Sequence, residues 1–547
     1  MIRPLLAAVL LTLTCAAPAW AADNPLVEAP AGRLEGRMSG EVRAFKGIPY
    51  AAAPVGDLRW APPRPAAHWD GLRQADDFGP ACPQFRAPPG GIYWAPPPPM
   101  SEDCLSLNVW APAKAGPKDS KGAPVIVWIH GGSFAGGSSR ETLYEGTKMA
   151  GRGVVVVSIN YRLGVLGFLA HPELSAESPD GLSGNWGLLD QVEALRWVQR
   201  NIAAFGGDPG NVTIAGESAG GLSVAYLMAM PSARGLFAKA ILQSAYTTSA
   251  PELKQASNGT PSAEASGQAL AARLGAADVA SLRAIDADKL IAKSAFAYFP
   301  FPTVDGKLIP RQLVDTFDRG EQAPVPLIAG FNSGEIRSLM ILAPKTPLTA
   351  GAYEKTIRDN YGDLADSFLG LYPSRDMGES ILATTRDGLY GWTAWRLAAK
   401  QTAAGQSAYL YIFDHSYPAA DSAGLHAFHG AELPYMFGNI NRAGPYWPAI
   451  PQTPGERAMA DAMVDYWVSF ATTGRPKARG APDWPAFGRP GYFMAFQDVP
   501  KVSADLLPGV FALHESVVCR RRAAGTQPWV WNLGLAAGVI PPKAEGC

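Results

Sequence analysis

Three short runs of β-branched and other apolar residues constrain this chain more than any other feature of its sequence. They span residues 125–129, 154–159 and 212–215 and lack the polar alternation of a strand with one wet face. Such runs are typical of strands buried on both faces of a parallel sheet. Residues 188–205 instead repeat Leu, Val and Ile at helical spacing. Strands that alternate with helices indicate an α/β fold, a mostly parallel central sheet with helices on both faces.

The same theme continues toward the C-terminus, where residues 240–242, 326–329 and 408–413 form further apolar runs. The chain has 547 residues, of which 47% are hydrophobic, enough for a large core. No internal repeat, low-complexity segment or linker divides it. We therefore expect a single folded domain over residues 23–547.

The charge balance excludes several classes of partner. Lys and Arg total 47 and Asp and Glu total 48, with both signs mixed along the chain. The absence of a basic stripe or acidic tail argues against nucleic-acid binding and against electrostatic attachment to a membrane. The chain also lacks an H-E-x-x-H motif, a C-x-x-C motif and a P-loop, so we expect no metal and no organic cofactor.

Residues 1–22 have the pattern of a signal peptide. A short cationic start precedes an apolar run over 5–13, and the small residues Ala19, Ala21 and Ala22 follow. We expect cleavage near Ala22, because the run is too short to span a bilayer. Cys15 leaves a lipoprotein as an alternative, although Thr14 precedes it where a smaller residue is usual. Export is expected, to the periplasm or the medium, with no membrane span in the mature chain.

Four cysteines remain after the signal: Cys82, Cys104, Cys519 and Cys547. An even number in an exported protein indicates disulfides, with free buried thiols as the alternative. Three pairings are possible, and proximity favours Cys82–Cys104 and Cys519–Cys547. The first pair would close a Pro- and Gly-rich loop that cannot be helical.

The strongest motif is the sequence GESAG at residues 216–220. It lies between the apolar run 212–215 and a helix expected from about Ala219. A strand that turns sharply into a helix needs small flanking residues and lifts the central serine clear of the sheet. Ser218 is therefore a candidate nucleophile, against the alternative of an ordinary turn serine.

A second motif, HGGSF, follows the run 125–129. Acyl transfer needs N–H donors aimed at the developing oxyanion, and a glycine-rich loop lets the backbone approach substrate. Gly132, Ser133 and Ala219 are the expected donors. A simple turn after the strand is the alternative. His130 is expected to brace this loop, because it precedes Ser218 in the chain order.

Several longer segments resemble one family. Residues 205–220, 102–109 and 184–191 are similar to motifs of the type-B carboxylesterase/cholinesterase family, and the match begins near residue 26. Ser106 is a departure, because an aromatic residue or Thr is commoner there. The resemblance implies the α/β-hydrolase fold and a serine carboxylesterase that acts on a small-molecule ester.

The resemblance also implies the remaining site residues. Segment 330–335 is similar to the one that carries the triad acid, which points to Glu335, and segment 429–433 to the one that carries the base, His429. Glu217 is then expected to stabilise the histidine cation and Ser244 to hydrogen-bond the acid. A merely structural polar contact is equally consistent with the last two. The Cys82–Cys104 cystine also matches a family loop.

Substrate identity stays open at this stage, as does the oligomeric state. Trp94 and Tyr93 are candidates for an aromatic substrate rim, with loop packing as the alternative. Ser133 stands where some relatives have a third glycine, which leaves activity on tertiary alcohol esters undecided. Amide cleavage and acyl transfer also remain open.

An adhesion role, found in relatives that lost the triad, is disfavoured because all three positions are filled. His426 is a weaker candidate for the base, since no glycine follows it.

Overall fold

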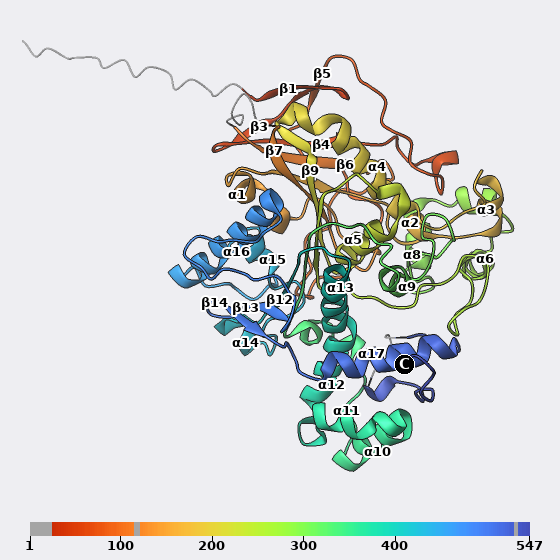
Figure 1. The fold of residues 1–547 in the computed structure, drawn as a ribbon. Coiled ribbons are helices and arrows are strands. Elements are labelled where there is room, and N and C mark those ends of the chain that lie inside the picture. Colours follow the sequence, from red (N-terminus) through yellow and green to blue (C-terminus); the bar gives the residue numbers. More distant parts are fainter. Residues whose placement is uncertain (1–23, 114–120, 530–533) are drawn as a thin grey trace, which may run out of the picture.

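The computed structural model describes residues 24–113, 121–529 and 534–547, so the expected signal peptide lies outside the described residues. Eleven strands form one central sheet in the order β14-β13-β12-β11-β10-β9-β7-β8-β6-β4-β3 (Figure 1). The strands are β3 (Arg37–Ser39), β4 (Val42–Pro49), β6 (Ser106–Pro112), β7 (Ala123–Ile129), β8 (Val155–Ile159), β9 (Gly207–Glu217), β10 (Lys239–Gln243), β11 (Leu327–Asn332), β12 (Ala408–Phe413), β13 (Tyr492–Phe496) and β14 (Pro500–Ala504).

The directions of the strands confirm the predicted sheet. From β8 through β7, β9, β10, β11 and β12 to β13, every neighbouring pair is parallel. Antiparallel pairs occur only toward the edges, where β6, β4 and β3 extend one side and β14 the other. Each apolar run predicted as a strand coincides to within one residue with part of one of the parallel strands.

Both faces of the sheet are buried, which explains the unbroken apolar runs. Along β7, Val125, Val127 and Ile129 pack into one core and Ile126 and Trp128 into the other. The first core also contains side chains of helices α4 (Trp186–Asn201), α5 (Ala219–Ala229) and α13 (Trp392–Ala403). The second contains those of α1 (Thr147–Ala150), α15 (Leu433–Met436) and α16 (Pro454–Thr473). These two sets lie on opposite sides of the sheet in Figure 1.

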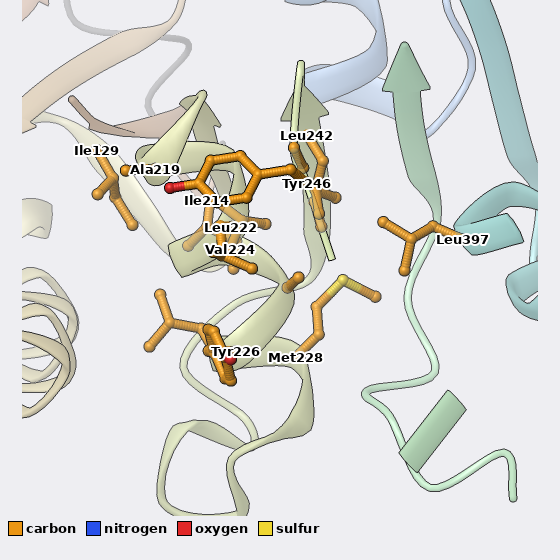
Figure 2. Close-up of a cluster of buried hydrophobic side chains, with 14 of the residues drawn as sticks. Ile129, Ile214, Ala219, Leu222, Val224, Tyr226, Met228, Leu242, Tyr246 and Leu397 are labelled. Atoms are coloured by element: carbon orange, nitrogen blue, oxygen red, sulfur yellow. The ribbon is translucent and has the colours of Figure 1, made fainter. Parts of the chain in front are cut away.

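Helix α5, which follows Ser218, is buried along its whole length. A helix that is apolar all round belongs in the interior rather than at a surface. Figure 2 shows its side chains gathered with Ile129, Ile214 and Leu242 in one buried cluster. Because three strands and α5 share this cluster, the start of the helix is held firmly against the sheet.

The remaining elements surround this framework. A small sheet combines β1 (Leu26–Ala29), β2 (Gly32–Glu35) and β5 (Leu72–Gln74). The other helices are α2 (Gly164–Phe168), α3 (Pro172–Glu177), α6 (Ala263–Leu274), α7 (Val279–Arg283), α8 (Ala287–Ser294), α9 (Leu313–Asp318), α10 (Ala350–Tyr361), α11 (Ala365–Leu371), α12 (Met377–Arg386), α14 (Pro418–Ser422) and α17 (Val510–Ala524). In the described ranges, no helix has both the length and the apolar character needed to cross a bilayer.

Both predicted cystines are present. Cys82–Cys104 closes the Pro-rich loop, which contains no helix, and Cys519–Cys547 ties α17 to the C-terminal residue. The first cystine is buried against the core around β6.

Candidate active site

Ser218 occupies the sharp turn between β9 and α5. Its backbone has φ 56° and ψ −122°, a strained conformation for a residue with a side chain. A Cβ on Gly220 would lie 2.0 Å from the carbonyl oxygen of Ile129, and one on Gly216 would lie 2.4 Å from the carbonyl carbon of Gly220. Only glycine fits on either side, so the turn holds the serine at the carboxyl end of the strand as the motif predicted.

Glu335 and His429 meet beside this turn. Glu335 begins the 3-10 turn η5 (Glu335–Ser338) after β11 and is fully buried. Its Oε1 accepts hydrogen bonds from Ser244 Oγ at 2.6 Å and from the Asn332 N–H at 2.8 Å. Its Oε2 lies 2.5 Å from His429 Nδ1. The carboxylate is thus fixed by two donors and faces one nitrogen of the imidazole.

The other nitrogen of the ring faces a second carboxylate. His429 Nε2 lies 3.1 Å from Glu217 Oε1, but that oxygen has no hydrogen-bond partner, so the contact is close without being aligned. Ser218 Oγ makes no hydrogen bond with the part of the chain that the structure describes. Such bonds are often loose before substrate binds. The imidazole therefore contacts Glu335 through Nδ1 and lies beside Glu217 through Nε2.

Burial and neighbouring charges have opposite effects on the pKa values of His429 and Glu217. Burial lowers the pKa of His429, but the carboxylates of Glu217 and Glu335 outweigh it and raise that pKa to about 9. Burial raises the pKa of the Glu217 carboxyl to about 8, although the His429 cation acts against this rise. Glu217 and the imidazole thus compete for one proton, and both carboxylates stabilise the imidazolium.

Sequence reasoning missed a third buried acid, Glu432. Its Oε2 accepts a hydrogen bond from Asn332 Nδ2 at 2.6 Å, and its Oε1 accepts one from Gln243 Nε2 at 3.0 Å. Burial raises its pKa. The only signal in the sequence was its place three residues after His429, which gives no hint of its distant partners.

The glycine-rich loop lies directly against the serine. A Cβ on Gly131 would lie 3.1 Å from Ser218 Cβ. The next residues have positive φ: 102° at Gly132, 55° at Ser133 and 57° at Phe134. The N–H groups of Gly132, Ser133 and Ala219 have no acceptor among the described residues. Free N–H groups beside a nucleophile are suited to binding an oxyanion.

His130 lies beneath this loop, as expected. Its Nδ1 is 2.9 Å from the Gly131 carbonyl oxygen, and its ring stacks on Tyr161 with centroids 4.6 Å apart. Burial lowers its pKa to about 4, so it is neutral at pH 7. His426 is also far from a catalytic role, because it is half exposed and pairs with Asp421 at 2.7 Å.

The two rim candidates differ in their contacts. The Trp94 ring packs edge-on against Tyr446, and its N–H donates to the Ala87 carbonyl of the same loop at 3.2 Å. Both contacts are with the protein itself, which agrees with loop packing. The Tyr93 hydroxyl instead donates to the carbonyl of His429 at 2.7 Å. Within the described residues, no group of three or more His, Cys, Asp or Glu side chains has the arrangement of a metal site.

Comparison with known proteins identifies the family of this chain. The profile of the carboxylesterase family matches residues 23–507. The chain is 37% identical to a fumonisin B1 esterase of Sphingopyxis macrogoltabida, over 85% of each chain. It is 36% identical to a para-nitrobenzyl esterase of Bacillus subtilis, over 85% of this chain and 93% of the relative.

Solved structures agree as well. A para-nitrobenzyl (PNB) esterase superposes with a TM-score of 0.77 and 32% identity, covering 90% of this chain and 99% of the other. A carboxylesterase of Geobacillus stearothermophilus has a TM-score of 0.76 and 35% identity, covering 89% and 99%. With the family profile spanning nearly the whole chain and esterases as its relatives, this protein belongs to the carboxylesterase family and is a carboxylic ester hydrolase of the α/β-hydrolase fold.

Proposed function

We propose that the enzyme cleaves its ester through an acyl-enzyme on Ser218, with His429 as general base and Glu335 as the acid that orients it. The observation that supports this most is the 2.5 Å contact between Glu335 Oε2 and His429 Nδ1, next to a serine in a strained turn. A serine hydroxyl is a weak nucleophile until a base accepts its proton. This arrangement supplies such a base.

In the first half of the reaction, Ser218 Oγ attacks the ester carbonyl carbon while His429 Nε2 takes the hydroxyl proton. Glu335 holds Nδ1–H and stabilises the imidazolium. The N–H groups of Gly132, Ser133 and Ala219 bind the negative oxygen of the tetrahedral intermediate. His429 then protonates the departing alcohol. In the second half, His429 takes a proton from water as the water attacks the acyl carbon, and it returns this proton to Ser218 Oγ as the acid is released.

We propose small-molecule carboxylic esters as substrates, in line with the relatives named for fumonisin B1 and para-nitrobenzyl esters. We further propose one catalytic domain over residues 23–547 that acts after export. The two cystines support the export proposal, because disulfides persist in oxidising compartments. A panel of p-nitrophenyl esters of rising chain length, with an anilide and a choline ester, would define the acid and alcohol parts.

The nucleophile is tested by Ser218→Ala. This variant should lose roughly 10³-fold or more in kcat on p-nitrophenyl butyrate. Its melting temperature should stay close to that of the parent, because the change is small and local. The parent should also acquire one organophosphate adduct by mass spectrometry, and the variant none. Labelling of the variant at full stoichiometry would refute the assignment.

The base is tested by a pair of histidine variants. His429→Ala should reduce kcat by roughly 10³-fold or more. His426→Ala, only three positions away but exposed and paired with Asp421, should keep parental activity. The two variants together separate the loss of the base from a general disturbance of this loop. Equal losses in both would argue against His429 as the base.

A further inference from the structure

The main chain of His429 is enclosed in a small cycle of hydrogen bonds that the reaction scheme does not use. The Tyr93 hydroxyl donates to the His429 carbonyl oxygen at 2.7 Å and lies 2.6 Å from Ser338 Oγ. Ser338 Oγ in turn accepts from the His429 N–H at 3.3 Å. Each hydroxyl has one proton to give. With the Tyr93 proton on the carbonyl, the Ser338 hydroxyl can donate to the Tyr93 oxygen at 2.6 Å, which closes the cycle, and it also lies 3.4 Å from the Glu335 carbonyl oxygen.

The cycle joins three segments that are far apart in the sequence. Tyr93 belongs to the loop closed by Cys82–Cys104. Ser338 is the last residue of η5, the turn that Glu335 begins. The third segment carries His429. The same cycle therefore connects the backbone of the proposed base to the turn that carries the proposed acid.

The ring of Tyr93 is itself held in place. It packs edge-on against Trp447, with centroids 6.1 Å apart, and lies 6.5 Å from Phe428, the residue before His429. A second link between the acid and base segments runs from the Gly334 N–H to the Ala427 carbonyl at 2.8 Å. The segment that carries Glu335 and the segment that carries His429 are therefore joined on both sides of the 2.5 Å contact between these two residues.

We propose that Tyr93 is a positioning residue, which orients the imidazole of His429 toward Glu335 by holding the main chain of the histidine through its carbonyl and through Ser338. This inference rests on the proposed role of His429. It differs from a role in the substrate rim, because the hydroxyl is engaged by the protein rather than presented to a ligand.

Tyr93→Phe tests the proposal, because it removes the hydroxyl and keeps the packed ring. We expect kcat on p-nitrophenyl butyrate to fall roughly tenfold, since one hydrogen bond that aligns the reacting groups is lost. KM should change less than twofold. The acid limb of the pH profile of kcat/KM should move to lower pH, because an imidazole turned away from Glu335 loses support for its cation.

Tyr446→Phe is the matched control. Tyr446 has the same 46% exposure as Tyr93 and also packs against a tryptophan, but its hydroxyl has no hydrogen-bond partner among the described residues. Its removal should leave kcat, KM and the pH profile unchanged. Thermal melts of both variants should match the parent.

Ser338→Ala opens the same cycle from its other side. Because one cycle is broken in either case, Tyr93→Phe and Ser338→Ala combined should lower kcat no more than the larger single effect. Fully additive losses, a rise in KM at unchanged kcat, or no change in Tyr93→Phe would each overturn the proposal. If His429→Ala were active, the proposed function would fail instead, so the two failures are distinguishable.

Discussion

At the scale of single residues, the site is defined by one imidazole between two carboxylates of different character. Glu335 is fixed by Ser244 and the Asn332 N–H and meets Nδ1 at 2.5 Å. Glu217 meets Nε2 at 3.1 Å without hydrogen-bond alignment. The first contact sets the tautomer and orientation of the ring, whereas the second acts mainly through charge. The pH dependence of the reaction separates these two effects.

Glu217→Gln should move the acid limb of kcat/KM to lower pH by about one unit. The proposed base, His429, must be neutral to act, so the rate is expected to fall as pH drops through its pKa. A nearby carboxylate stabilises the cation and raises that pKa, and its replacement by an amide therefore lowers it. The measurement is a pH–rate profile from pH 4.5 to 9.5 with a p-nitrophenyl ester.

Glu379→Gln, a change of an exposed acid that pairs with Arg337, should leave this profile in place. An unchanged profile in Glu217→Gln would mean that the Glu217 side chain is uncharged throughout the range.

At the scale of elements, the serine depends on the contact between the start of α5 and the end of β7. The N-terminal glycines of α5 lie so close to the strand that a Cβ on Gly220 would meet the Ile129 carbonyl oxygen at 2.0 Å. This approach also places the glycine-rich loop, which leaves β7 one residue later, beside Ser218. The proposed nucleophile and the candidate oxyanion donors are therefore positioned by a single helix–strand contact.

Gly220→Ala should lower the free energy of unfolding by about 1–3 kcal/mol, because backbone must shift to accommodate the methyl group. Activity should fall further than stability suggests, since the shift separates Ala219 from Gly132. Urea unfolding and ester kinetics measure the two effects. Gly351→Ala in α10, where a Cβ meets open space, is the control and should cost neither stability nor activity. Parental kinetics in Gly220→Ala would contradict this dependence.

At the scale of the whole molecule, two cystines of similar span serve different regions. Cys82–Cys104 closes a loop of sequence separation 22, and Cys519–Cys547 one of 28. The first loop carries Tyr93 to the His429 segment, whereas the second ties α17 to the C-terminus. Similar loop lengths imply similar entropic contributions to stability. Their contributions to catalysis should not be similar.

Replacement of either cysteine pair by alanines should lower the free energy of unfolding by roughly 3 kcal/mol. Only the Cys82 and Cys104 pair should also lower kcat at temperatures well below the melting transition, because Tyr93 then loses its fixed loop. Denaturant titration and kinetics at 15 °C separate stability from activity. Equal kcat values in the two double variants would show that the cystine does not matter for the position of Tyr93.

Local pattern alone identified the framework and the centre of the site. The runs 125–129, 154–159 and 212–215 match β7, β8 and β9 to within one residue, because strands buried on both faces must be continuously apolar. The motif around Ser218 predicted a strained turn, since only glycine permits that close approach. Glu335 and His429 were identified by resemblance to the family, and the structure brings them together at 2.5 Å.

Tertiary structure alone decided the groups that support these residues. Glu432 meets Asn332 and Gln243 across the ends of β10 and β11, and Tyr93 meets His429 across 336 positions of sequence. No local periodicity encodes such contacts, because they depend on which loops the sheet order places side by side. The antiparallel edge strands were missed for the same reason, since strand pairing is set by long-range packing. The sequence thus determined the sheet and the strained turn that carries Ser218, whereas folding determined which distant groups contact His429 and its neighbours.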